Sequence, residues 1–330
     1  MAGVRFGRAM LGATLCLAAG CALIEVTIAE PEDVIVAEVQ VVLTLAPDTY
    51  ELSLTAWGLL HRTHWPAGTP SISGTVVEVS AGPGRVVRLE EQDSVELCIS
   101  EDPLDRDSLE IELSSDAACY QAEVDPAPFV PGEKLSVRIV APDGRVLGGA
   151  SRVPGAFSLI ELNQEDGRCR LDPDTNYRFR WTSARNVWAY IADARFEGLT
   201  EALAPRGIES PDTVYLLGLS IGGEDTTIVF PRDFGVFEFF NADETERQVL
   251  RELWKGLPEG SSAGVAIAAA DRNWVNWARG GNFNPSGLIR IPSVFGDGTG
   301  VFATATRRQV WVKSSVAGEW EPPLCGRAEP

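Results

Sequence analysis

The chain has 330 residues, of which 45% are hydrophobic, enough for folded cores, and this excludes a wholly disordered chain. Its length exceeds one average domain and predicts two. The 47 acidic residues outnumber the 28 lysines and arginines, and the formal net charge of -19 would repel phosphate backbones, so nucleic acid is not expected as a partner.

The first 20 residues are typical of an export leader. Arg5 and Arg8 precede an apolar run at residues 10–19, which is too short to span a membrane stably. The run ends in Leu17-Ala18-Ala19-Gly20-Cys21, which resembles the lipobox of bacterial lipoproteins, where cleavage precedes a cysteine that carries diacylglycerol. We therefore expect residues 1–20 to be a lipoprotein signal peptide. The alternative is an ordinary secretory signal with an incidental cysteine.

The expected anchor is the side chain of Cys21. Each buried methylene of an acyl chain such as palmitate contributes about 0.8 kcal/mol, and two or more chains hold a protein stably on a membrane. Ala22 follows instead of an aspartate, and by resemblance to enterobacterial sorting this favours the outer membrane. Residues 21–30 would then be the lipidated N-terminus and tether, and the protein would be extracytoplasmic.

Four cysteines remain beyond the leader and the expected anchor: Cys98, Cys119, Cys169 and Cys325. An oxidising compartment permits any of their three pairings. We favour Cys98 with Cys119 and Cys169 with Cys325, because each pair lies inside one expected domain. The alternative is four reduced, buried thiols. Neither a CxxC pair nor a Cys/His zinc spacing occurs, so we expect no metal cluster and no cofactor.

Alternating apolar and polar residues predict short strands along the first half of the chain. Turn residues separate them, at Ala81-Gly82-Pro83-Gly84 and at Pro142-Asp143-Gly144. The expected strands cover residues 34–45, 50–55, 74–80, 85–90, 108–114, 134–141 and 145–153. Such a series without a convincing helix predicts an immunoglobulin-like or transthyretin-like β-sandwich over residues 31–154.

Pro154-Gly155 is the expected boundary of a second β-rich domain, residues 155–330. Its expected strands cover residues 177–182, 186–196, 213–220, 226–230, 264–270, 300–306 and 309–314. Residues 243–257 predict a helix, with Asp243 as its N-cap and Pro258 ending it. A second short helix is expected at residues 271–279, where Asp271 can cap and Gly280-Gly281 follow.

Several short motifs carry a family resemblance. They are residues 130–137 (VPGEKLSV), Asp143-Gly144-Arg145, Val153-Pro154 and residues 293–302 (SVFGDGTGVF). Together with the lipobox, they are similar to a domain-of-unknown-function family of Gram-negative envelope lipoproteins. The resemblance implies a sandwich domain followed by a second β-rich domain, and genes often placed beside those of outer-membrane receptors. The family has no established activity, so it implies no catalytic residue.

The function expected from these features is a binding or scaffolding role for a lipid-anchored cell-envelope protein. By the resemblance, it would be accessory to an outer-membrane receptor or transporter, and the acidic surface favours a basic face on that partner. The alternatives are an extracytoplasmic glycan-active enzyme and a purely structural envelope component.

The residues 218–222 (GLSIG) fit the G-x-S-x-G pattern of a nucleophile elbow around Ser220. An elbow needs a strand, a tight turn and a helix, with an acid and a histidine later in the chain. Both histidines, His61 and His64, lie far upstream, and the residues after Gly223 predict another strand. We therefore expect a glycine-rich turn here and no catalytic residue.

Two polar clusters are candidate ion sites. His61 and His64 are three residues apart, but Trp65-Pro66 and Gly68 argue against a helix there, so a polar loop is favoured. The acidic loop 101–107 carries carboxylates that could hold calcium, at Glu101, Asp102, Asp105 and Asp107. It lacks the EF-hand spacing, and a solvated charged loop is the favoured alternative.

An aromatic cluster near the second predicted helix is the candidate ligand platform. Its members are Trp274, Trp277, Arg279, Asn282 and Phe283. Amphipathic aromatic rings beside an amide and a guanidinium suit a sugar or peptide ligand. The alternative is that the two tryptophans belong to the core, because helical aromatics three residues apart often do.

Overall fold

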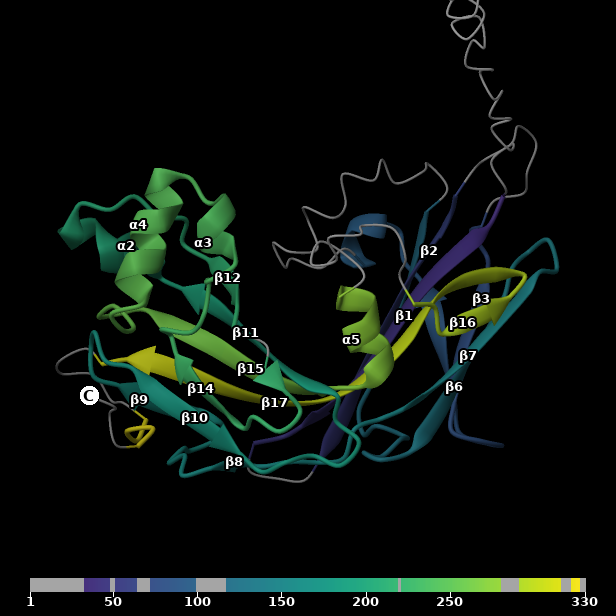
Figure 1. Cartoon of the computed structure of the whole chain (residues 1–330), viewed down its shortest axis with the longest axis horizontal. Helices are drawn as coiled ribbons and strands as arrows, with labels where there is room; N and C mark the ends of the chain where they lie inside the picture. The colour runs from purple at the N-terminus through teal and green to yellow at the C-terminus, as the bar shows by residue number, and fades with distance from the viewer. Residues whose placement is uncertain are drawn as a thin grey trace, which may run out of the picture. The chain divides into compact units, whose positions relative to one another are not determined.

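The computed structural model describes residues 33–47, 51–63, 72–98, 117–218, 221–279, 291–315 and 322–326. The fold is mainly β with a few short helices, which confirms the predicted class (Figure 1). The expected signal peptide, the tether and Cys21 lie outside the described residues, as do the acidic loop 101–107 and the strand expected at 108–114.

Nine strands pair in a closed ring in the order β1-β2-β5-β4-β3-β6-β7-β16-β17, and β17 returns to β1. Their bounds are β1 (Ile35–Leu45), β2 (Leu52–Arg62), β3 (Val76–Ser80), β4 (Val86–Glu91), β5 (Ala118–Val124), β6 (Lys134–Val140), β7 (Val146–Arg152), β16 (Val294–Gly296) and β17 (Gly298–Ser314). The ring differs from the two-sheet sandwich that the alternation predicts. It closes because β16 and β17, from the far end of the chain, fill the space between β7 and β1.

Glycines make this closure sterically feasible. β1 and β17 pair in parallel from Ile35 opposite Gly298 to Leu45 opposite Arg308. A Cβ on Gly298 would lie 2.4 Å from the carbonyl oxygen of Ile35, which is closer than real side-chain atoms approach. The glycine-rich stretch at residues 296–300 therefore has a packing role, since it lets the backbones approach closely at the seam.

The sheet continues along the second part of β17, which extends beyond the ring. The added strands are β9 (Arg168–Leu171), β11 (Ala189–Glu197), β12 (Val214–Leu217), β13 (Ile221–Gly222) and β15 (Ser262–Ala270). In this part β17 pairs with β15 on one edge and β9 on the other. A separate three-stranded sheet contains β8 (Leu159–Ile160), β10 (Tyr177–Trp181) and β14 (Thr227–Phe230). The helical segments are η1 (Val95–Cys98), α2 (Leu199–Leu203), η2 (Ala204–Arg206), α3 (Glu238–Asn241), α4 (Glu244–Leu253) and α5 (Arg272–Arg279).

Both predicted helices form, as α4 and α5. At α4 the Asp243 carboxylate accepts a 2.9 Å hydrogen bond from the backbone N–H of Glu246, and the Glu246 carboxylate accepts one of 2.8 Å from the backbone N–H of Asp243. This reciprocal capping box explains the sharp start of the helix. The helix ends at Leu253, earlier than the Pro258 stop predicts.

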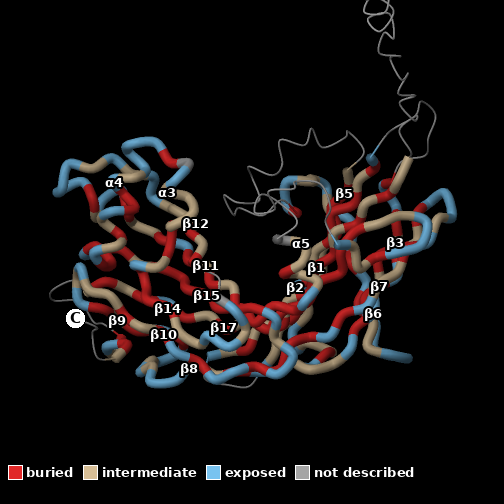
Figure 2. Tube along the Cα trace, in the orientation of Figure 1, coloured by how far each residue is buried: buried red, intermediate tan, exposed pale blue. Residues whose placement is uncertain are grey.

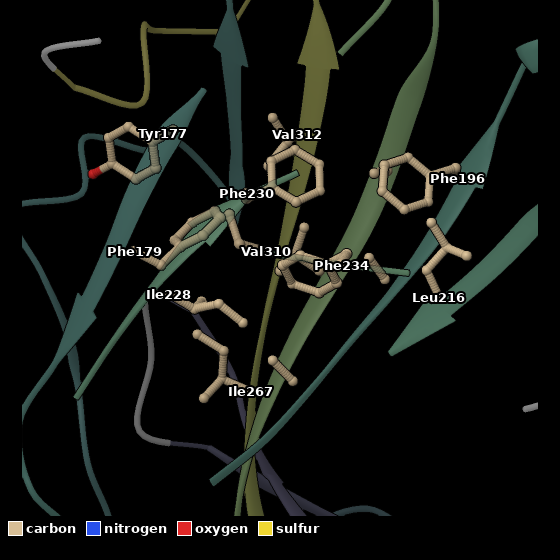
Figure 3. Packing of buried hydrophobic residues seen from close by; sticks show 14 of the residues in the cluster. Tyr177, Phe179, Phe196, Leu216, Ile228, Phe230, Phe234, Ile267, Val310 and Val312 are labelled. Carbon is tan, nitrogen blue, oxygen red and sulfur yellow. The ribbon is translucent and has the colours of Figure 1, made fainter. Parts of the chain in front are cut away.

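Two hydrophobic cores divide near residue 154, with Val153 in the first and Phe157 in the second. Figure 2 shows buried residues along the strands of both. The second core is rich in aromatic rings, and Figure 3 shows Phe179, Phe230 and Phe234 packed within it. The first core also includes Val294 and Phe302 from the far end of the chain, so β17 serves both cores. Residues 33–330 accordingly form one compact unit.

Two disulfides close the structure, Cys98–Cys119 and Cys169–Cys325, which are the pairs favoured from the sequence. The first joins η1 to β5 and the second joins β9 to the C-terminal segment, across 156 positions of sequence. Structural disulfides persist in oxidising compartments, so the bridges indicate an extracytoplasmic location. Within the described ranges, no helix has the length and apolar character needed to cross a bilayer.

Candidate functional site: the helix α5 and its surroundings

A buried aspartate fixes α5 to the ring. Asp271 is only 4% exposed, and its Oδ1 accepts a 2.8 Å hydrogen bond from the backbone N–H of Trp274, which caps the helix. Its Oδ2 accepts hydrogen bonds from the hydroxyls of Ser151 on β7 and Thr304 on β17. One carboxylate therefore holds the start of α5 against two strands of the ring.

Burial raises the pKa of Asp271 above its ordinary value, although hydrogen bonds from Ser151, from the Trp274 N–H and at Thr304 lower it. Desolvation disfavours the charged carboxylate, and the donors around it recover only part of that cost. Within the described residues this group contacts hydroxyls and backbone amides instead of a cationic side chain. Its role in the geometry is therefore to position the helix.

Asn273 supplies a second attachment of α5. Its Nδ2 donates hydrogen bonds of 2.9 Å to the carbonyl oxygen of Phe302 on β17 and 3.2 Å to that of Ala150 on β7. On the opposite flank, Val275 is buried against Ala189 and Ala270. The helix is thus held by polar contacts on one side and by apolar packing on the other.

The two tryptophans of the predicted platform both lie on α5. Trp274 is half-buried and packs against the cluster of Ala189, Ala270 and Val275, while Trp277 is also half-buried. Each indole therefore keeps part of its surface accessible, which is intermediate between a core residue and a free platform. The Arg279 side chain, Asn282 and Phe283 lie outside what the structure describes.

A third tryptophan, Trp188, was missed from the sequence. It lies just before β11, is 46% exposed, and donates a 2.9 Å backbone hydrogen bond to the carbonyl oxygen of Ala270. The guanidinium of Arg272, the first residue of α5, lies 5.3 Å from the centroid of the Trp188 ring. This cation–π contact brings an exposed aromatic ring to the start of α5. In the sequence, Trp188 stands inside the strand predicted at residues 186–196, and its contact with Arg272 forms only in the tertiary fold.

The remaining sequence candidates do not join this site. His61 lies on β2 opposite Val36, and His64 and Ser220 are outside the described residues. The described residues after Ser220 form β13 and β14, where a nucleophile elbow would need a helix. Over the described part of the chain, no group of three or more histidine, cysteine or acidic side chains is arranged to hold a metal ion.

No protein-family model and no curated protein matches the chain. Among solved structures, it is similar to a crystal structure of trypsin activated alpha-2-macroglobulin from Escherichia coli, at 11% identity and a TM-score of 0.19. That match covers 84% of this chain and 15% of the other. A likeness at this level carries no argument about fold or function.

Proposed function

We propose that this protein is an exported, lipid-anchored protein of the cell envelope, with a binding or scaffolding role exerted through α5 and Trp188. The anchor would be Cys21, and the membrane would be the outer membrane. The two disulfides support export. In this proposal, the ring keeps the strand pattern of an immunoglobulin-like or transthyretin-like sandwich and acts as the support for α5.

The fixing of α5 by Asp271 is the observation that carries the binding role. A short helix on a sheet face is marginal by itself, since isolated helices of this length do not form in water. Here a buried carboxylate and the Asn273 amide hold it in one position. Such support for half-exposed tryptophans suits a surface that must present aromatic groups in a fixed geometry.

The partner in this proposal is an outer-membrane receptor or transporter in the same envelope. A protein with a formal charge of -19 would associate faster with a basic partner face, and the association would weaken as salt is raised. Trp188 and Arg272 supply an aromatic group and a cation of the kind that concentrates binding energy in protein interfaces.

Site-specific photo-crosslinking in cells tests this proposal. Trp188 is replaced with p-benzoylphenylalanine, and the matched control carries the same group at Val130, an exposed residue of the ring loops that is 49% exposed. We expect one discrete adduct from position 188 and none from 130. Trp274→Ala combined with Trp277→Ala should remove the adduct while the protein still unfolds in one cooperative transition, at a melting temperature lowered by the lost packing of Trp274. Equal adducts at both positions, or none at either, would rule out this binding surface.

A further inference from the structure

The second exposed tryptophan of the sheet, Trp311, lies on the face opposite the aromatic core. Val310 and Val312 of β17 point into that core, as Figure 3 shows, and strand geometry therefore directs Trp311 to the other face. It is 38% exposed. Its partners across the sheet are Gly264 of β15 and Arg168 of β9.

Gly264 leaves room for the indole of Trp311. A Cβ added to Gly264 would lie 3.4 Å from both Cη2 and Cζ2 of Trp311 and 3.6 Å from Nε2 of Gln309. The ring therefore leans across β15, where it occupies the space that a larger side chain would take. An aromatic ring held in this way over the sheet, with part of its surface free, is a stacking platform.

Charged groups lie on the same face, up to two strands from this ring. The guanidinium of Arg195, which is opposite Gly264 on β11, lies 5.5 Å from the centroid of the Tyr215 ring on β12. In the next row, Asp193 forms a 3.1 Å ion pair with Arg307 across the small residues of β15. These groups offer hydrogen-bond donors and acceptors on the face that carries Trp311.

The charge of this face is opposite in sign to that of the chain. Four rows of paired residues direct their side chains to this face, the rows of Lys313, Trp311, Gln309 and Arg307 in β17. These rows carry five cations and two acids. These side chains are Arg168, Arg170, Arg195, Arg307, Lys313, Asp193 and Glu197. Two further acids lie beside these residues: Glu165 is the antiparallel partner of Arg168, and a carboxylate oxygen of Asp172 lies 3.6 Å from the guanidinium of Arg170. With them the face carries five cations and four acids, a net positive charge of one on a chain whose formal charge is -19. Glu197 pairs with Arg195, Asp193 with Arg307 and Asp172 with Arg170, and the exposed Arg168 forms no ion pair with another described residue.

We infer that this face, which we call the Trp311 face, binds an acidic saccharide. The apolar side of a pyranose ring would stack on Trp311, and Arg195 and Arg168 would bind the carboxylate or phosphate of the sugar. Arginine suits that task because its planar fork matches carboxylate and phosphate geometry. The cationic face complements an anionic ligand, and an aromatic ring beside it selects a sugar over a simple anion. This inference depends neither on the lipid anchor nor on α5.

Calorimetry with three trimers tests the inference on the mature protein. Trigalacturonate has pyranose rings and three carboxylates, maltotriose has the rings without the charge, and triglutamate has the carboxylates without the rings. We expect trigalacturonate to bind most tightly, with an affinity that falls as sodium chloride is raised. Equal affinity for triglutamate would overturn the stacking role, and equal, salt-independent affinity for maltotriose would overturn the charge role. No measurable heat with any of the three would overturn the site.

Three variants locate the binding. Trp311→Ala should weaken trigalacturonate about tenfold. Gly264→Val should do the same, because the new side chain displaces the indole while valine suits a strand. The matched control is Phe295→Ala, which removes an exposed aromatic ring from β16. Unchanged affinity in Trp311→Ala with a native melting curve, or an equal loss in Phe295→Ala, would contradict the assignment.

Discussion

Gly300 of β17 lies directly against the backbone of Ala37 in β1, so closely that a Cβ on Gly300 would be 1.9 Å from the Ala37 carbonyl oxygen. Its φ of 146° is also unfavourable for any other residue. This contact lies at the seam where the ring closes.

Gly300→Ala should therefore destabilise the protein by about 3 kcal/mol or more, since overpacking against backbone has no flexible side chain to absorb it. The matched control is Gly144→Ala, at a turn with positive φ and nothing within 4 Å, where we expect a loss of about 1 kcal/mol from strain alone. Urea denaturation measures both. Equal losses would show that the seam is not tightly packed.

The raised pKa of Asp271 predicts that the difference in stability between wild type and Asp271→Asn depends on pH. Burial raises the pKa of Asp271 above the ordinary 3.8, so the folded state binds a proton at this carboxyl group more tightly than the unfolded state does. The wild-type protein therefore loses stability as the pH rises above 3.8 and the group deprotonates. Asp271→Asn does not titrate. Its stability relative to wild type should therefore increase as the pH rises above about 3.8. A difference that stays constant with pH would contradict the assigned pKa shift.

Asp271→Ala tests the attachment of α5 itself. It removes the helix cap and leaves the hydroxyls of Ser151 and Thr304 without their shared acceptor. We expect a loss of about 2 kcal/mol at neutral pH, measured by chemical denaturation. Near-UV circular dichroism should change as well, because Trp274 would lose its fixed orientation. An unaltered spectrum would mean that α5 is held by its apolar packing alone.

The two disulfides should contribute unequally to stability. In the chain-entropy model, the Cys169–Cys325 bridge, which closes the longer loop, contributes about 5 kcal/mol and the Cys98–Cys119 bridge about 3 kcal/mol. Replacing each pair by serine and comparing melting temperatures measures this order. A larger loss from the shorter loop would show that contacts in the native state, and not loop closure, set the contribution.

The cap at Asp243 could be predicted from its local residue pattern and the disulfide pairs from the expected domain boundary, whereas the long-range pairing of strands could not. The sequence predicts two strands, at residues 300–306 and 309–314, where the structure has the single strand β17. It is continuous because the buried Arg308 donates hydrogen bonds to the carbonyl oxygens of Ala46 and Phe157.

Ring closure had no local signal. β1 and β17 are neighbours only because segments from opposite ends of the chain pair, and alternation within each strand does not identify its partner. β5 was missed for a different reason, since Ala118, Cys119 and Tyr120 are consecutive buried residues that break the alternating pattern. Of the candidate platform, the sequence identified Trp274 and Trp277 but not Trp188, which reaches α5 only through the tertiary fold.

Intact-mass spectrometry of the protein purified from native membranes tests most directly whether Cys21 anchors an exported protein. We predict a chain that begins at Cys21, carries the added mass of diacylglycerol and acyl groups, and has lost four hydrogens to its two disulfides. A chain that retains residues 1–20 and has every thiol free would contradict the account.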